Sequence, residues 1–118
     1  MVWLIDSYKF GMIVINEISY TSDVIIFPER VLDGWWRREG HRLYVEDLKE
    51  VINASPQPGV LVVGTGYSGL MKVSNEVKEG LRSRGIEMIV QPTRQACQTF
   101  NELSESGRRV VATFHITC

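Results

Sequence analysis

Short apolar runs separated by polar turn residues fill the first part of the chain. Runs rich in β-branched residues predict strands over residues 12–15, 18–20 and 23–27. The connections at Asn16-Glu17 and Thr21-Ser22 are too short to join parallel strands, so these segments are predicted to pair antiparallel. Pro28 ends the third run because its nitrogen carries no hydrogen for a ladder bond.

The middle of the chain has a mixed pattern. Residues 31–42 hold two adjacent tryptophans among charged residues and predict a short strand or an ordered loop. Apolar residues then recur at helical spacing, which predicts a first helix over residues 45–52. This helix is expected to end before Pro56, because proline disfavours helical backbone in the residue before it.

The second half alternates continuous apolar runs with amphipathic stretches. The apolar runs predict buried strands over residues 60–63, 86–90 and 110–116. Between the first two, one apolar stripe predicts a helix that ends at Gly85; its members are Leu70, Val73, Val77 and Leu81. Between the last two, a second helix is predicted to begin at Thr93 as its N-cap and to end at Gly107.

These elements together predict a single domain over residues 1–118 with a three-layer α/β fold. Its mixed central sheet would combine a C-terminal βαβαβ half with an N-terminal antiparallel strand and hairpin region. The orientation of the last strand stays open. The strands at 60–63 and 86–90 are expected to be neighbouring inner strands. The loops that follow them should then share one rim, where ligands bind in open α/β sheets.

Composition narrows the classes of partner and location. Hydrophobic residues make up 44% of the 118 residues and charged residues 23%, as in ordinary globular domains. The formal net charge of −1 offers no positive field to nucleic acid. The chain shows no signal peptide, no bilayer-length apolar run and only two cysteines. We therefore expect a cytoplasmic protein with no nucleic-acid partner and no membrane insertion.

Several segments together resemble a known family. In order along the chain they are Trp36-Arg37, His41, Val60-Leu61-Val62-Val63-Gly64-Thr65-Gly66, Lys72-Val73, Arg84-Gly85-Ile86, Gln91-Pro92-Thr93, Ala96, Phe100-Asn101-Glu102-Leu103 and Phe114-His115-Ile116-Thr117-Cys118. The family consists of small α/β domains and includes the adipogenesis-associated domain protein and mitochondrial complex I assembly factor 3. The resemblance implies a three-layer fold with a mixed sheet, and assembly or regulatory roles for the eukaryotic relatives. It implies no established catalytic activity.

A glycine-rich turn is the first candidate site. Its residues are Gly64, Thr65, Gly66, Tyr67, Ser68 and Gly69, which match G-x-G-x-x-G between a strand and a predicted helix. Three interpretations stay open: a turn whose glycines serve packing, an anion site, and a dinucleotide site. A dinucleotide site would need a carboxylate at the end of the next strand, and the sequence has none there. Thr93 and Arg94, in the next loop, would complete an anion site, although an N-cap and a solvated arginine are the simpler roles.

A second candidate is the segment Trp35, Trp36, Arg37 and Arg38. Tryptophan and arginine are enriched in binding hot spots, so the segment would form a partner-binding surface. The alternative is that one tryptophan covers the sheet beneath an arginine side chain. His115 is interpreted as a hydrogen-bonded sheet residue and Cys97 as a core residue. No metal site is expected from His41, His115, Cys97 and Cys118.

The sequence leaves two functional hypotheses. The preferred one is a non-catalytic binding, assembly or regulatory module that engages another protein or itself, because no convergent set of catalytic residues is evident. The alternative is a small-ligand protein or simple enzyme that binds phosphate or carboxylate at residues 64–69. Neither hypothesis calls for a cofactor.

Overall fold

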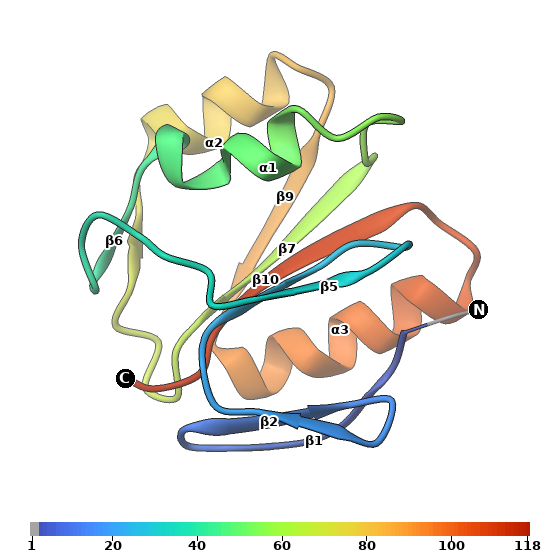
Figure 1. The fold of residues 1–118 in the computed structure, drawn as a ribbon. Helices are drawn as coiled ribbons and strands as arrows, with labels where there is room; N and C mark the ends of the chain where they lie inside the picture. Colours follow the sequence, from blue (N-terminus) through green and yellow to red (C-terminus); the bar gives the residue numbers. More distant parts are fainter. Residues whose placement is uncertain (1–2) are drawn as a thin grey trace.

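The structure, a computed structural model, describes residues 3–118 around a five-stranded mixed sheet of order β5-β4-β10-β7-β9 (Figure 1). The bounds of these strands are Val24–Ile26 for β4, Val31–Asp33 for β5, Val60–Thr65 for β7, Glu87–Gln91 for β9 and Val110–His115 for β10. The last strand, β10, runs parallel to β7 and antiparallel to β4. It therefore joins the two halves of the chain at the centre of the sheet.

The N-terminal residues form a separate antiparallel sheet of order β1-β2-β3. These strands span Ile5–Lys9, Met12–Ile15 and Ile18–Tyr20. Asn16 and Glu17 both have positive φ, as hairpin turns with the right-handed twist of the strands require. The predicted antiparallel pairing across Asn16-Glu17 is thus confirmed. The pairing predicted across Thr21-Ser22 is wrong, because the chain passes there from β3 to β4 in the main sheet, where β4 pairs antiparallel with β5 and β10.

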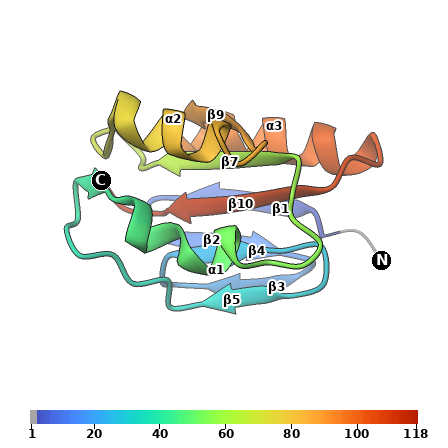
Figure 2. The same cartoon turned by 90° about the horizontal axis from the view of Figure 1, so that it is seen from above.

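Two cores flank the five-stranded sheet, which gives the predicted three layers. One face is covered by α2, Asn75–Arg82, and by α1, Lys49–Ile52, which continues the 3-10 turn η1 at Val45–Leu48 (Figure 1). The other face packs against α3, Thr93–Glu105, and the three-stranded sheet. Viewed from above, the strands follow one another across the molecule from β9 to β5 (Figure 2).

The predicted helix through Leu70 and Val73 is wrong in its first part. Leu70 lies in an exposed loop, and Lys72–Val73 forms the short strand β8, which pairs with β6 at Arg42–Leu43. The helix α2 begins later because Ser74 is its N-cap and accepts a hydrogen bond from the Val77 N–H. The glycine turn therefore does not open a helix.

The strand β9 also differs from its prediction. It neighbours β7 in parallel register, as expected, but it is an edge strand and not an inner one. Its side chains from Met88 to Gln91 are accordingly only partly buried.

Candidate functional site

The loops that leave β7 and β9 meet at one rim of the sheet, as the sequence predicts. The backbone N–H of Gly66 donates to the Thr93 hydroxyl at 2.8 Å, and the N–H of Thr93 donates to the Gly66 carbonyl at 3.0 Å. The C-terminal residues join the same rim, since the Tyr67 N–H donates to the Thr117 carbonyl at 2.7 Å.

Side chains and backbone fill the space around the glycine turn. A Cβ on Gly64 would lie 2.7 Å from the Phe114 ring and 2.8 Å from the Thr93 hydroxyl. A Cβ on Gly66 would lie 2.6 Å from the Cys118 carbonyl oxygen. Both glycines therefore permit close packing around the turn. This agrees with the interpretation that the glycines serve packing.

Two further residues of the turn, Thr65 and Ser68, differ in their surroundings. The hydroxyl of Thr65 donates to the Gln91 carbonyl, and Ser68 lies exposed. The N–H groups of Gly66, Tyr67 and Gly69 all donate to protein acceptors. A dinucleotide fingerprint needs a helix directly after the turn, which this fold lacks. Anion binding at residues 64–69 stays a prediction.

Thr93 is not the N-cap that its position predicts. Pro92 occupies the N-cap position of α3, and Thr93 is the first helical residue. Its hydroxyl is fully buried and donates to the His115 carbonyl at 2.6 Å while accepting from Gly66. Thr93 therefore ties the start of α3 to β10 and to the glycine turn.

Arg94 lies beside aromatic rings at this rim. Its guanidinium carbon is 5.7 Å from the ring centre of Tyr67 and 6.0 Å from that of Tyr8. Phe10 meets Tyr67 edge to face at 5.9 Å between ring centres. Arg94 is an exposed residue, as its simpler role predicts, and its guanidinium lies at the edge of this aromatic group.

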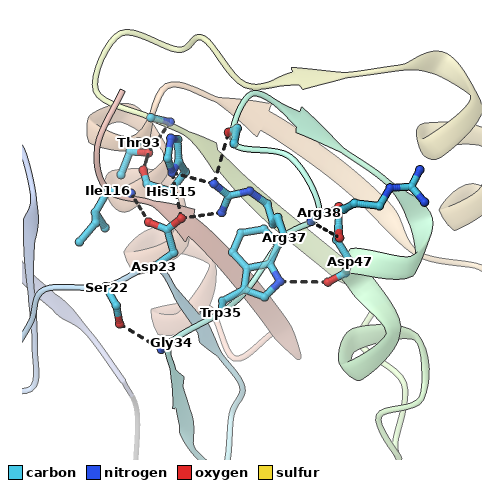
Figure 3. A network of polar contacts seen from close by, with 12 residues as sticks. Ser22, Asp23, Gly34, Trp35, Arg37, Arg38, Asp47, Thr93, His115 and Ile116 are labelled. Atoms are coloured by element: carbon cyan, nitrogen blue, oxygen red, sulfur yellow. Dashed lines mark hydrogen bonds and ion pairs between the residues drawn. The ribbon is translucent and has the colours of Figure 1, made fainter.

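A buried polar cluster, which sequence reasoning missed, consists of Asp23, Arg37 and His115 (Figure 3). Arg37 Nη1 donates to Asp23 Oδ2 at 2.5 Å, and His115 Nδ1 lies 2.9 Å from the same oxygen. Arg37 Nη2 lies 3.0 Å from His115 Nδ1 and donates to the Gly40 carbonyl at 3.3 Å. The second oxygen of Asp23 accepts from the Ile116 N–H at 2.9 Å.

Asp23 is held in its charged form by these donors. Burial acts to raise the pKa of Asp23, but hydrogen bonds from His115, the Ile116 N–H and Arg37 outweigh it and lower that pKa below its ordinary value. The side chains of Arg37 and His115 are 6% and 7% exposed, so the ion pair is shielded from solvent.

Two nitrogen atoms of this cluster have no hydrogen-bond partner within residues 3–118. They are Nε of Arg37 and Nε2 of His115, both buried. In addition, His115 Nδ1 lies between a donor on Arg37 and an acceptor on Asp23 and can serve only one of them at a time. The cluster is therefore under-satisfied at His115.

The tryptophan and arginine segment divides into a buried and an exposed part. Trp35 is buried and its Nε1 donates to the Asp47 carbonyl at 2.9 Å, while the Arg37 guanidinium lies 4.8 Å from the Trp35 ring centre. Trp36 is 77% exposed. The Arg38 side chain is also exposed and lies over the Tyr44 ring. Trp35 and Arg37 therefore have the structural role that was the alternative to partner binding, a tryptophan packed beneath an arginine. Trp36 and Arg38 face solvent.

The remaining candidates stay apart. His115 is a buried, hydrogen-bonded sheet residue as predicted. Cys118 lies near His41, with 3.9 Å between the Sγ atom of Cys118 and the Nε2 atom of His41. Burial raises the pKa of the Cys97 thiol to about 12, as suits a core residue.

Along residues 3–118, no three His, Cys, Asp or Glu side chains gather as a metal site would need. In the same residues, no helix has the length and apolar character to cross a membrane.

Curated proteins related to this chain carry the name of an assembly factor. The zebrafish (Danio rerio) NADH dehydrogenase [ubiquinone] 1 alpha subcomplex assembly factor 3 is 36% identical over 99 residues, which cover 83% of this chain and 55% of the relative. The human protein of that name is 32% identical over 105 residues, with 88% and 55% covered. The chain thus spans about half the length of these relatives.

The fold is also that of solved structures. A conserved hypothetical protein from Pyrococcus horikoshii OT3 superposes with a TM-score of 0.79 at 28% identity, covering 97% of this chain and 98% of that one. A family model described as "Protein of unknown function (DUF498/DUF598)" matches residues 5–115. With that match over nearly all of its length, the chain belongs to the DUF498/DUF598 family, as its resemblance to complex I assembly factor 3 predicts.

Proposed function

We propose that this protein is a non-catalytic binding module that contacts a protein partner through the loop of residues 34–41. The observation that carries the proposal is the exposure of Trp36, at 77%, on a loop whose neighbouring residues are fixed to the core. Tryptophan and arginine are both among the residue types enriched in interface hot spots.

The loop is ordered before any partner arrives. Trp35 is anchored by its hydrogen bond to Asp47, and the Arg38 N–H donates to the Asp47 carboxylate at 3.2 Å. Arg37 fixes the same segment to Asp23 and to the Gly40 carbonyl. A surface held in its bound shape loses less conformational entropy on association, which favours affinity.

The relatives support a role in assembly. Two proteins that are 32% and 36% identical to this chain over the aligned residues are named as assembly factors, and an assembly factor acts by contacting other proteins. We extend this class of function, and not the particular complex, to the present chain. A protein partner fits the net charge of −1 better than a nucleic acid. The free thiols of Cys97 and Cys118 suit the reducing cytoplasm that we propose as its location.

The test compares chemical crosslinking and affinity capture from the source cells by the wild type and by Trp36→Ala with Arg38→Ala. Arg37 is left intact because its removal would disrupt the buried cluster. Ile18→Ala, which trims a 55% exposed side chain on β3, is the matched control. We expect specific partners to be lost from the double variant and kept by the control. Equal capture by all three proteins would overturn the proposal.

A further inference from the structure

The two edges of the main sheet differ in how well they are protected from pairing with another strand. An edge strand presents backbone N–H and C=O groups to any strand that approaches, and proteins commonly block it with short length, charges, proline or a bulge. At one edge, β5 has only three residues and ends at Asp33. At the other edge, β9 has five residues, without proline, lysine or a bulge against β7 (Figure 1).

The smaller sheet protects its own edges. Its edge strand β3 has three residues. The other edge strand, β1, contains Asp6 and Lys9, and its register shifts between Ile5 and Ser7. The side chain of Asn101 from α3 also covers the backbone of Ile5, because Oδ1 accepts from the Ile5 N–H at 2.8 Å and Nδ2 donates to the Ile5 carbonyl at 3.0 Å. Of the edges of these two sheets within residues 3–118, only that of β9 is both long and unblocked.

The backbone of β9 directs two of its residues at this open edge. In a parallel pair, alternate residues of a strand direct their N–H and C=O groups to the neighbouring strand. The Glu87 N–H donates to the Gly59 carbonyl at 3.0 Å, which identifies the residues of β9 that face β7. These residues are Glu87, Ile89 and Gln91. The backbone groups of Met88 and Val90 therefore point away from β7.

A second copy of β9, running antiparallel, matches these directions about a two-fold axis at Ile89. Met88 then lies opposite Val90 of the second copy, and these residues form the hydrogen-bonded pairs of an antiparallel ladder. Between them, Ile89 lies opposite Ile89 of the second copy in a pair without hydrogen bonds, where side chains are closest. Apolar side chains that are only partly buried in one chain thus meet apolar side chains on both faces of the joined sheet.

Charge favours the same arrangement. Glu87, whose Oε1 lies 3.6 Å from Arg108 Nη2, would lie opposite Gln91 of the second copy, and an amide can donate to a carboxylate. Parallel pairing in register would instead place Glu87 opposite Glu87, and like charges directly opposite each other destabilise a sheet. The sequence of β9 thus complements itself, which favours a second copy over an unrelated strand.

The helix α2 does not close over this edge. A hollow between α2 and the start of β9 is lined by Lys78, Arg82 and Met88 among others. The side chains from Met88 to Gln91 all keep part of their surface exposed. An approaching strand can therefore reach the backbone of β9.

We propose that this chain forms a two-fold dimer by antiparallel pairing of β9 with β9, which joins the two main sheets into one continuous sheet. The loop of residues 34–41 begins after β5, at the opposite edge of the sheet, so the dimer does not depend on the proposed function. If both hold, the dimer presents two copies of the loop to a partner.

The first test is sedimentation equilibrium of the wild type from about 1 µM to about 1 mM, a range that covers weak and moderate dimers. We expect the mass to rise with concentration from that of one chain to that of two. The mass of a single chain at every concentration would overturn the proposal.

A matched pair of double variants locates the contact. Met88→Lys with Val90→Lys places like charges opposite each other and should raise the dimer Kd about tenfold or more. Met88→Glu with Val90→Lys keeps the second substitution but places opposite charges there, and should dimerise more tightly than the first variant. Circular dichroism verifies that both are folded. Two folded variants with the same Kd would overturn the proposed pairing.

A disulfide test decides if the charged variants do not fold. Ile89→Cys in a Cys118→Ser background places two thiols at the two-fold axis, where opposing Cα atoms about 4.5 Å apart allow a disulfide. Ile18→Cys in the same background is the control, because Ile18 is exposed on β3. Under mild oxidation, the Ile89→Cys protein should form covalent dimers about tenfold faster than the control. Equal rates would contradict the pairing of β9 with β9.

Discussion

Trp36 and Arg37 are adjacent in the sequence but opposite in exposure: Trp36 is 77% exposed, and the Arg37 side chain is 6% exposed. Arg37 faces the core, where it pairs with Asp23, and thereby holds its neighbour at the surface. The loop therefore carries the proposed contact residue, Trp36, next to Arg37, the buried residue that fixes the loop to the core.

Asp23→Asn should destabilise the protein strongly. The substitution keeps the size of the side chain but leaves the buried guanidinium of Arg37 without a counter-charge, and breaking a buried pair in this way costs about 3 kcal/mol. Urea unfolding followed by circular dichroism measures the loss. The control is Glu29→Gln, which breaks the exposed Glu29–Arg109 pair and should leave the unfolding midpoint nearly unchanged. Equal effects of the two variants would contradict the structural role of Asp23.

The contribution of Asp23 to stability should disappear in acid. Because its pKa is lowered in the folded state, Asp23 binds its proton less readily there than in the unfolded chain. Its contribution is complete above its ordinary pKa of 3.8 and is lost as the pH falls below that value. The difference in free energy of unfolding between wild type and Asp23→Asn should therefore narrow from about pH 5 to about pH 2. A difference that stays constant over this range would count against the pairing.

Gly66→Ala should be poorly tolerated. Gly66 has φ of +109°, and a Cβ there would lie 2.6 Å and 2.8 Å from two backbone atoms of Cys118. Strained backbone and a clash with main chain should together cost about 2 kcal/mol in unfolding free energy. Gly59→Ala serves as the control because a Cβ at Gly59 meets no atom within 4 Å. Similar melting temperatures for the two variants would show that the turn at Gly66 does not pack against the C-terminal residues.

The two thiols should differ sharply in reactivity. Cys118 is exposed, whereas burial raises the pKa of Cys97 to about 12, so Cys97 contributes almost no thiolate near neutral pH. Iodoacetamide should label Cys118 about a hundredfold faster than Cys97 in the folded protein, and both at similar rates in urea. Mass spectrometry identifies the labelled peptide. Cys118→Ser should leave the folded protein unlabelled, and rapid labelling of that variant would place Cys97 outside the core.

Much of the fold follows from local pattern. The strands at 12–15 and 18–20 and the buried run from Val60 to Val63 were predictable because their β-branched runs are bounded by turn residues. The error at Leu70 and Val73 arose because helical spacing extended by chance through a loop and the strand β8. The cap at Ser74, followed by Asn75 and Glu76, was the local signal that this spacing obscured.

The buried cluster could not be predicted from spacing. Asp23 and His115 are 92 residues apart and meet only because β10 inserts between β4 and β7. One sequence signal was available: His115 interrupts an otherwise apolar strand, and a buried polar side chain requires a partner. Its two partners gave no comparable signal. Asp23 lies just before β4 and Arg37 lies in a charged loop after Trp35, and charged residues at such positions usually belong to turns and loops.

The most direct test of the loop as a protein contact is hydrogen–deuterium exchange of the purified complex with a crosslinked partner, compared with the free chain. We expect slower exchange in residues 34–41, centred on Trp36, and unchanged exchange in the β1–β3 sheet. Protection confined to other surfaces, with residues 34–41 exchanging as in the free protein, would contradict the account.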